Sequence, residues 1–137
     1  MDLLIEQLKK HEGFRSKPYL CTAGKLTIGY GRNLDDVGVS EAEAMELLRQ
    51  DVARARREVM LNIPVANVLD DARADVLINM CFNMGIYRLM GFKRMIAALE
   101  QRDYMQASAE MQNSKWAKQV GTRSVELMVQ MQTGMYQ

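Results

Sequence analysis

The sequence predicts an α+β fold that is mostly helical and has one short β-hairpin near the N-terminus. Apolar residues recur at helical spacing over most of the chain. Two short runs with strand character, 15–21 and 26–30, flank a polar turn that contains Gly24. A capping box, with Ser40 at the N-cap and Glu43 three residues later, opens a long helical stretch.

The first helix is predicted over residues 2–12. Asp2 is a suitable N-cap, and Gly13 a suitable residue after the helix end. The apolar residues that share one face of this helix are Leu4, Ile5 and Leu8. Glu12 therefore falls in the last turn, where the helix dipole disfavours a negative charge by a few tenths to about 1 kcal/mol.

The long helix is predicted from Ser40 to about Leu61, where Pro64 prevents its continuation. Its expected core-facing stripe is Ala44, Leu47, Leu48, Val52, Ala55 and Val59. The next helix, Asp71 to Met84, is apolar nearly all round and is expected to be buried, with Cys81 as a structural thiol.

Three shorter helical segments follow, about 92–100, 103–111 and 123–132, and Trp116 lies in a short amphipathic stretch. The twelve methionines are expected to serve as adaptable core filler.

Composition indicates one domain of 137 residues. A net charge of +1 indicates neither a nucleic-acid nor a membrane partner, and no apolar run reaches 18 residues. The N-terminus has no signal-peptide pattern. The two cysteines, 60 positions apart, are expected to be free thiols. His11 is the only histidine and no phosphate-loop pattern occurs, so we expect no metal or other cofactor.

The candidate catalytic residues are Glu12, Cys21 and Thr27. A hairpin can bring Cys21 and Thr27 from facing strands into one cleft, with Glu12 at the strand entry. A carboxyl group that favours its protonated form suits a general acid. A free thiol has a pKa near 8.5, which nearby cations lower; the candidates are Lys17, Lys25 and Arg32. Taken singly, each of the three is more often an ordinary surface or core residue.

The spacing of these three residues resembles the catalytic triad of the phage-type lysozymes, the endolysin muramidases of glycoside hydrolase family 24. Eight residues separate Glu12 from Cys21 and five separate Cys21 from Thr27, and the family has Asp or Cys in the middle. Its E-G-x-R-x-x-x-Y segment matches Glu12, Gly13, Arg15 and Tyr19, and its T-I-G-x-G segment matches Thr27, Ile28, Gly29 and Gly31. I-N-M-C-F-N-M-G and S-K-W resemble its central helix and late tryptophan segment.

The resemblance implies a lysozyme-like fold over 1–137. A small lobe of about 13–60 carries the hairpin, and the long helix joins it to a helical lobe of about 61–137, which also includes helix 2–12. The connection 31–40 is short for the family, which implies a reduced small lobe. The site residues implied beside the triad are Arg123, paired with Glu12, and Tyr19. An Arg32–Asp51 salt bridge is also implied, and the implied saccharide contacts are Asn33, Phe82, Met95 and Glu110.

The implied reaction is hydrolysis of the β-1,4 bond between N-acetylmuramic acid and N-acetylglucosamine in peptidoglycan. Glu12 would protonate the leaving oxygen, while Thr27 and Cys21 would activate a water on the opposite face of the sugar, giving inversion. Direct attack by a Cys21 thiolate, giving retention, remains an alternative. The implied partners are glycan strands and a holin, and the enzyme is expected to be a monomer. A holin is implied because the enzyme is made in the host cytoplasm and must cross the membrane before it can lyse the cell.

Two other classes of protein fit the residues alone. One is a cysteine hydrolase of peptide or amide bonds, with Cys21 as nucleophile and His11 as base. The other is a saccharide-binding module that keeps a lysozyme fold without activity.

Overall fold

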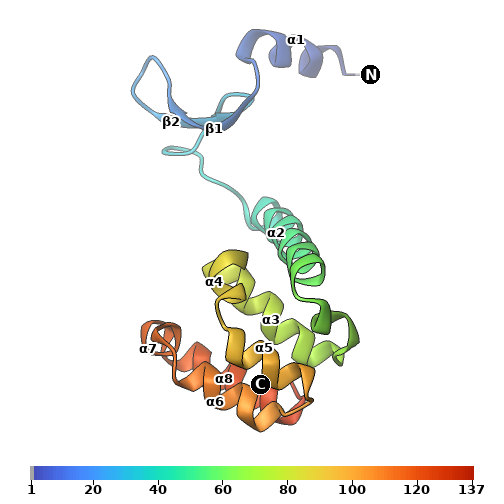
Figure 1. The fold of residues 1–137 in the computed structure, drawn as a ribbon. Helices are drawn as coiled ribbons and strands as arrows, with labels where there is room; N and C mark the ends of the chain where they lie inside the picture. The colour runs from blue at the N-terminus through green and yellow to red at the C-terminus, as the bar shows by residue number, and fades with distance from the viewer. Residues whose placement is uncertain (1) are drawn as a thin grey trace. The chain divides into compact units, whose positions relative to one another are not determined.

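The computed structural model describes residues 2–137, which form two compact units, one up to Leu47 and the other from Leu48. Helices predominate, and the single sheet among these residues is small and antiparallel (Figure 1). This confirms the mostly helical α+β class. No helix in this part of the chain is long and apolar enough to span a membrane.

The first unit contains one helix and the whole sheet. Its elements are α1 (Leu3–Glu12), β1 (Arg15–Leu20), β2 (Leu26–Gly29) and β3 (Arg32–Asn33). The Asp2 carboxylate accepts hydrogen bonds from two backbone amides in the first turn of α1, as an N-cap does. Gly13 has a φ of 71° and a ψ of 162°, so it ends the helix with positive φ and turns the chain into β1.

The three strands pair in the order β1-β2-β3. Tyr19 lies opposite Thr27, and Thr27 lies opposite Asn33, so Thr27 occupies the middle of the sheet. The hairpin was predicted, but β3 was not. This two-residue strand is held by the turn that follows it, in which the Asp35 carboxylate accepts from the Leu26 amide at 2.6 Å.

The predicted capping box is present at the start of α2 (Glu41–Asn62). The Ser40 amide donates to the Glu43 carboxylate at 2.9 Å, and the Glu43 amide donates to the Ser40 hydroxyl at 3.1 Å. The predicted stripe is buried only toward the C-terminal end of α2, at Ala55 and Val59. Leu47 is 53% exposed and Leu48 is 42% exposed.

The second unit continues with a 3-10 helix and six α-helices around one core. These are η1 (Pro64–Val68), α3 (Asp71–Met84), α4 (Ile86–Met90), α5 (Lys93–Glu100), α6 (Tyr104–Gln112), α7 (Lys115–Val120) and α8 (Thr122–Thr133). α3 has the predicted bounds and the predicted burial, with Cys81 only 5% exposed. The expected role as core filler is confirmed for four fully buried methionines, Met80, Met95, Met111 and Met131, whereas Met45, Met90, Met105 and Met135 are exposed. α4 was not predicted.

Candidate active site

Glu12, the last residue of α1, lies against the turn that joins β2 to β3. A Cβ atom added at Gly31 would meet the Glu12 Oε2 atom at 2.9 Å and its Cδ atom at 3.0 Å. Gly31 has a φ of +77°, a conformation that glycine adopts freely. The carboxyl group of Glu12 is therefore in contact with bare backbone in this turn.

Aromatic contacts join the end of α1 to the same turn. The ring of Tyr30 lies 5.4 Å from the ring of Phe14, measured between centroids. The Lys9 ammonium lies 5.6 Å from the centroid of the Tyr30 ring. Residues before and after Glu12 thus both contact the turn, which fixes the end of the helix beside the sheet.

Cys21 and Thr27 converge on one carbonyl group at the β1–β2 turn. The Cys21 amide donates to the Lys25 carbonyl oxygen at 2.9 Å, and the Thr27 hydroxyl donates to the same oxygen, also at 2.9 Å. Thr27 is buried, with 4% of its surface exposed, whereas Cys21 is partly open to solvent. The structure therefore brings these two predicted residues together.

The Cys21 thiol has a lowered pKa. The main cause is hydrogen bonding from the backbone of Lys25 and of Ala23, and the Thr27 hydroxyl adds to it. Hydrogen bonds to a thiolate favour the charged form. The side-chain cations suggested by the sequence are not the cause. The Lys25 ammonium, for example, pairs with Asp36 at 3.2 Å.

Arg32 and Asp51 each have a partner other than the predicted one. The Arg32 guanidinium makes two hydrogen bonds to the Glu43 carboxylate, at 3.0 and 2.6 Å, and holds the pKa of Glu43 down at about 2. Asp51 accepts from Arg54, one turn along α2, at 2.7 Å. Within the first unit, Arg32 thus forms a bidentate pair with Glu43 at the start of α2. The Arg32–Asp51 bridge, which would join the two units, stays a prediction.

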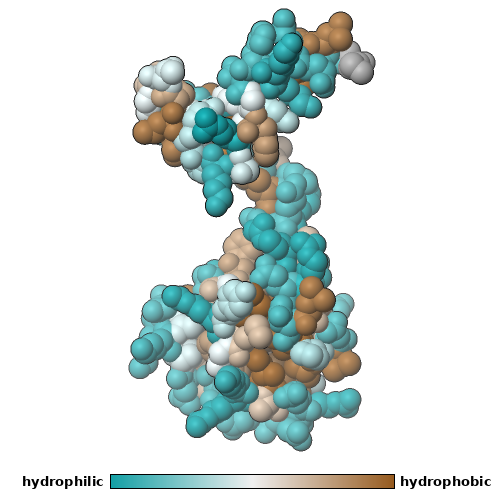
Figure 2. Space-filling view, turned by 45° about the horizontal axis from the view of Figure 1, so that its top comes forward, coloured by the Kyte–Doolittle hydropathy of each residue, from teal (hydrophilic) through white to brown (hydrophobic). Residues whose placement is uncertain are grey.

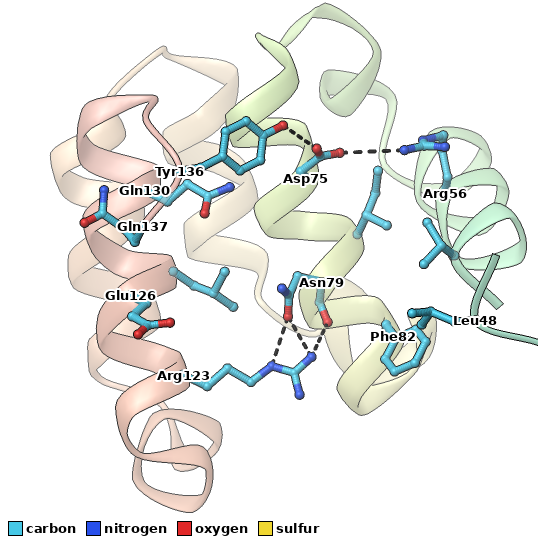
Figure 3. A pocket seen from close by; sticks show the side chains of 13 residues that line it. Leu48, Arg56, Asp75, Asn79, Phe82, Arg123, Glu126, Gln130, Tyr136 and Gln137 are labelled. Carbon is cyan, nitrogen blue, oxygen red and sulfur yellow. Dashed lines mark hydrogen bonds and ion pairs between the residues drawn. The ribbon is translucent and has the colours of Figure 1, made fainter. Parts of the chain in front are cut away.

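Arg123 lies in a pocket of about 480 Å³ on the second unit (Figure 3). Its Nε and Nη2 atoms both donate to the Asn79 side-chain oxygen, at 2.9 and 2.7 Å. Phe82, which is 45% exposed, lines the same pocket. The pairing of Arg123 with Glu12 stays a prediction.

The other predicted site residues have varied surroundings. Tyr19 lies opposite Thr27 in the sheet, and the Arg15 guanidinium lies 4.5 Å from the centroid of its ring. The Asn33 amide donates to the Asp36 carboxylate and accepts from the Asp36 backbone, which closes the turn after β3.

Met95 and Glu110 border a second pocket, of about 360 Å³, on the second unit. Met95 is fully buried, and Glu110 accepts a hydrogen bond from Gln106 at 3.0 Å. The saccharide roles of all four proposed contact residues stay predictions.

Two asparagines on α3 were missed by sequence reasoning. The Asn79 side-chain oxygen accepts from the Arg123 guanidinium, and the Asn83 side-chain oxygen accepts from the Trp116 indole at 2.8 Å. These residues are four positions apart, on one side of a helix whose second half is otherwise apolar. Polar side chains in such a helix require partners, and that requirement was the signal available in the sequence.

The remaining thiol and the metal-binding residue types show no further site. Burial raises the pKa of Cys81, and the nearby Glu58 carboxylate adds to the effect, as expected for a structural thiol. Among residues 2–137, no group of three His, Cys, Asp or Glu side chains is arranged to hold a metal ion.

Comparison with known proteins identifies the class of protein. The family match and the relatives show a lysozyme, a glycoside hydrolase. The profile of the family described as Phage lysozyme matches residues 9–132. The chain belongs to the phage lysozyme family.

Several relatives are similar over most of the chain. An endolysin of Acyrthosiphon pisum secondary endosymbiont phage 1 is 33% identical over 81% of this chain and 75% of its own length. A probable T4-type lysozyme of Dictyostelium discoideum is 27% identical over 94% of this chain and 93% of its own. The pre-baseplate central spike protein Gp5 of Enterobacteria phage T4 is 25% identical, and the match covers 28% of that protein.

Proposed function

We propose that this protein is an endolysin muramidase that hydrolyses the β-1,4 bond between N-acetylmuramic acid and N-acetylglucosamine. The observation that carries the proposal is the convergence of Cys21 and Thr27 on the Lys25 carbonyl, in a unit that also presents Glu12 at the end of α1. Family membership and the endolysin relative support the same activity.

Glu12 is the proposed general acid. It is exposed, and no hydrogen bond or ion pair occupies its carboxyl group within the described residues of its unit. It can therefore reach the glycosidic oxygen and transfer a proton to it as the bond to the anomeric carbon breaks.

Thr27 and Cys21 are proposed to hold the attacking water. The Thr27 hydroxyl proton is directed to the Lys25 carbonyl, so its oxygen remains available to accept a hydrogen bond from that water. The lowered pKa of Cys21 favours its thiolate, the form that can accept a proton. Attack by the water on the face opposite the leaving group would invert the anomeric centre.

The first test is loss of turbidity of chloroform-treated Gram-negative cells, with wild type, Glu12→Gln, Cys21→Asp and Cys21→Ser compared. We expect lysis by wild type and Cys21→Asp, and its loss in Glu12→Gln. If Cys21→Asp were also inactive, sulfur would be chemically required, and direct attack by the thiolate with retention would replace water activation. The anomer of the first product, followed by NMR, distinguishes the two routes independently.

Two further experiments distinguish the muramidase from the two other classes of protein. A cysteine hydrolase would lose peptide cleavage on alkylation of Cys21, whereas Glu12→Gln would spare it. In the described residues no hydrogen bond joins His11 to Cys21, as such a pair would require. A binding module would retain glycan strands without releasing any reducing ends.

Arg123 is proposed to support Glu12, as the family resemblance implies. Arg123→Ala should lower lysis, while Arg123→Lys, which keeps the charge, should retain more of it. Unchanged activity and stability in Arg123→Ala would count against this role.

The cellular context follows from the family. We infer that the enzyme is monomeric, accumulates in the host cytoplasm, and reaches glycan strands only after a holin permeabilises the membrane. Expression alone should then leave cells intact until chloroform is added. Lysis without any permeabilising treatment would contradict this inference.

A further inference from the structure

The contact between Glu12 and Gly31 is closer than a side chain at residue 31 would allow. A Cβ atom there would lie 2.9 Å from Oε2, 3.0 Å from Cδ and 3.2 Å from Cγ of Glu12. Ordinary van der Waals contacts begin near 3.4 Å. The whole carboxyl end of Glu12 therefore occupies the space that a side chain would fill.

Further contacts hold the end of α1 against the turn that contains Gly31. Tyr30, beside Gly31, contacts Phe14 and Lys9, which flank Glu12 in the sequence. The end of α1 cannot easily move away from the turn without breaking these contacts. Any crowding at residue 31 would therefore displace the flexible carboxyl end of Glu12 and leave the helix in place.

We propose that Gly31 positions Glu12 for proton transfer, because the absence of a side chain at residue 31 determines where the carboxyl group lies. The inference rests on the proposed role of Glu12 as general acid. An alanine at residue 31 would push the carboxyl group by about 0.5 Å or more. Displacements of about 1 Å in a catalytic group cost on the order of 100-fold in rate.

The test compares Gly31→Ala with Gly38→Ala. Gly38 also has positive φ, +65°, but a Cβ there would meet its nearest atom, the Leu34 carbonyl oxygen, at 3.9 Å. Both variants therefore strain the backbone, and only Gly31→Ala crowds Glu12. We expect similar decreases in Tm, with kcat/KM falling about 10- to 100-fold in Gly31→Ala and less than about 3-fold in Gly38→Ala. Equal losses of kcat/KM would overturn the proposal.

A second measurement does not depend on catalysis. In protein labelled with ¹³C at glutamate side chains, the carboxyl signal of Glu12, assigned with Glu12→Gln, should move in Gly31→Ala and stay in place in Gly38→Ala. An unmoved signal would overturn the proposal even if activity fell. If Glu12→Gln itself kept full activity, the proposed function would fail, while this signal would still report the contact.

A shorter acid provides the rescue. In the double variant Gly31→Ala/Glu12→Asp the carboxyl group is withdrawn from residue 31, so alanine should cost much less in stability and activity than it does beside glutamate. If Gly31→Ala failed to fold, folding of the double variant would support the contact. Failure of both, with Glu12→Asp alone folded, would overturn it.

Discussion

Replacing Thr27 by valine should remove catalysis while leaving the fold nearly intact. Valine keeps the volume and the β-branched shape that suit the middle of a sheet, and removes only the hydroxyl group. Thr27 is 4% exposed and lies between Tyr19 and Asn33 in the ladder, so its backbone position is fixed by pairing on both sides.

The expected stability loss follows from the hydrogen bonds. The Thr27 hydroxyl donates to the Lys25 carbonyl, which also accepts from the Cys21 amide, so this oxygen keeps a partner in the variant. A net hydrogen bond is worth about 0.5–1.5 kcal/mol when no partner is left unsatisfied. We therefore expect Thr27→Val to lower the free energy of unfolding by about 1 kcal/mol.

The expected loss of activity is larger. A group that orients or deprotonates the attacking water contributes about 10²- to 10⁴-fold to the rate, which is about 3–5 kcal/mol of activation free energy. Thr27→Ser restores the hydroxyl and should keep activity within about 10-fold of wild type.

The measurements are urea unfolding and initial rates on purified peptidoglycan for wild type, Thr27→Val and Thr27→Ser. Rates in Thr27→Val within 10-fold of wild type would refute the role of the hydroxyl. Equal loss in Thr27→Ser would refute it as well, since the chemistry would then depend on the shape of threonine and not on its oxygen.

Three further predictions concern thiols, packing and acid stability. Native protein should take up one equivalent of iodoacetamide at Cys21, because the pKa of this thiol is lowered. Cys81 is buried and has a raised pKa, so it should react only in urea. Mass spectrometry of native and unfolded samples would show both results. Arg73→Met should lower the free energy of unfolding by about 2–4 kcal/mol, because the Arg73 guanidinium donates to two carbonyls at the end of α8 and stacks on an aromatic ring. The control is Arg54→Met, which removes an exposed ion pair and should cost under about 0.5 kcal/mol. Urea unfolding measures both. Glu43 has a pKa lowered from 4.5 to about 2, so it contributes stability above pH 4.5 that is lost as the pH falls toward 2. The difference in free energy of unfolding between wild type and Glu43→Gln should therefore decrease over that range. A constant difference would contradict this prediction.

The elements of the fold that depend on local sequence were predictable. The Asp2 N-cap, the Ser40–Glu43 capping box and the bounds of α3 all follow from residues within a few positions of one another. The hairpin follows equally from a glycine between two strand-like runs. β3 was not predictable, because two residues carry no periodicity and the strand depends on side chains of the turn beyond it.

Side-chain partners were predicted less well, because they depend on backbone paths that the sequence does not show. The Arg32–Glu43 pair was not predicted, because it depends on the loop after β3, where the Gly38 carbonyl accepts from Arg32 at 3.0 Å and the guanidinium lies beside Glu43. The lowered pKa of Cys21 has a similar origin. Its cause is the path of the backbone around the β1–β2 turn, whereas the sequence suggested only side-chain cations.

The backbone origin of that shift bears on the mechanism. The same turn that lowers the pKa of Cys21 also accepts the Thr27 proton at the Lys25 carbonyl, so the Thr27 oxygen keeps lone pairs close to a sulfur that accepts hydrogen bonds more readily. An oxygen and a sulfur that both accept hydrogen bonds can hold one water between them. A thiolate used as a nucleophile would need no such neighbour. The arrangement therefore favours activation of a water and inversion over direct attack by sulfur, and an inverted first product is the expected outcome.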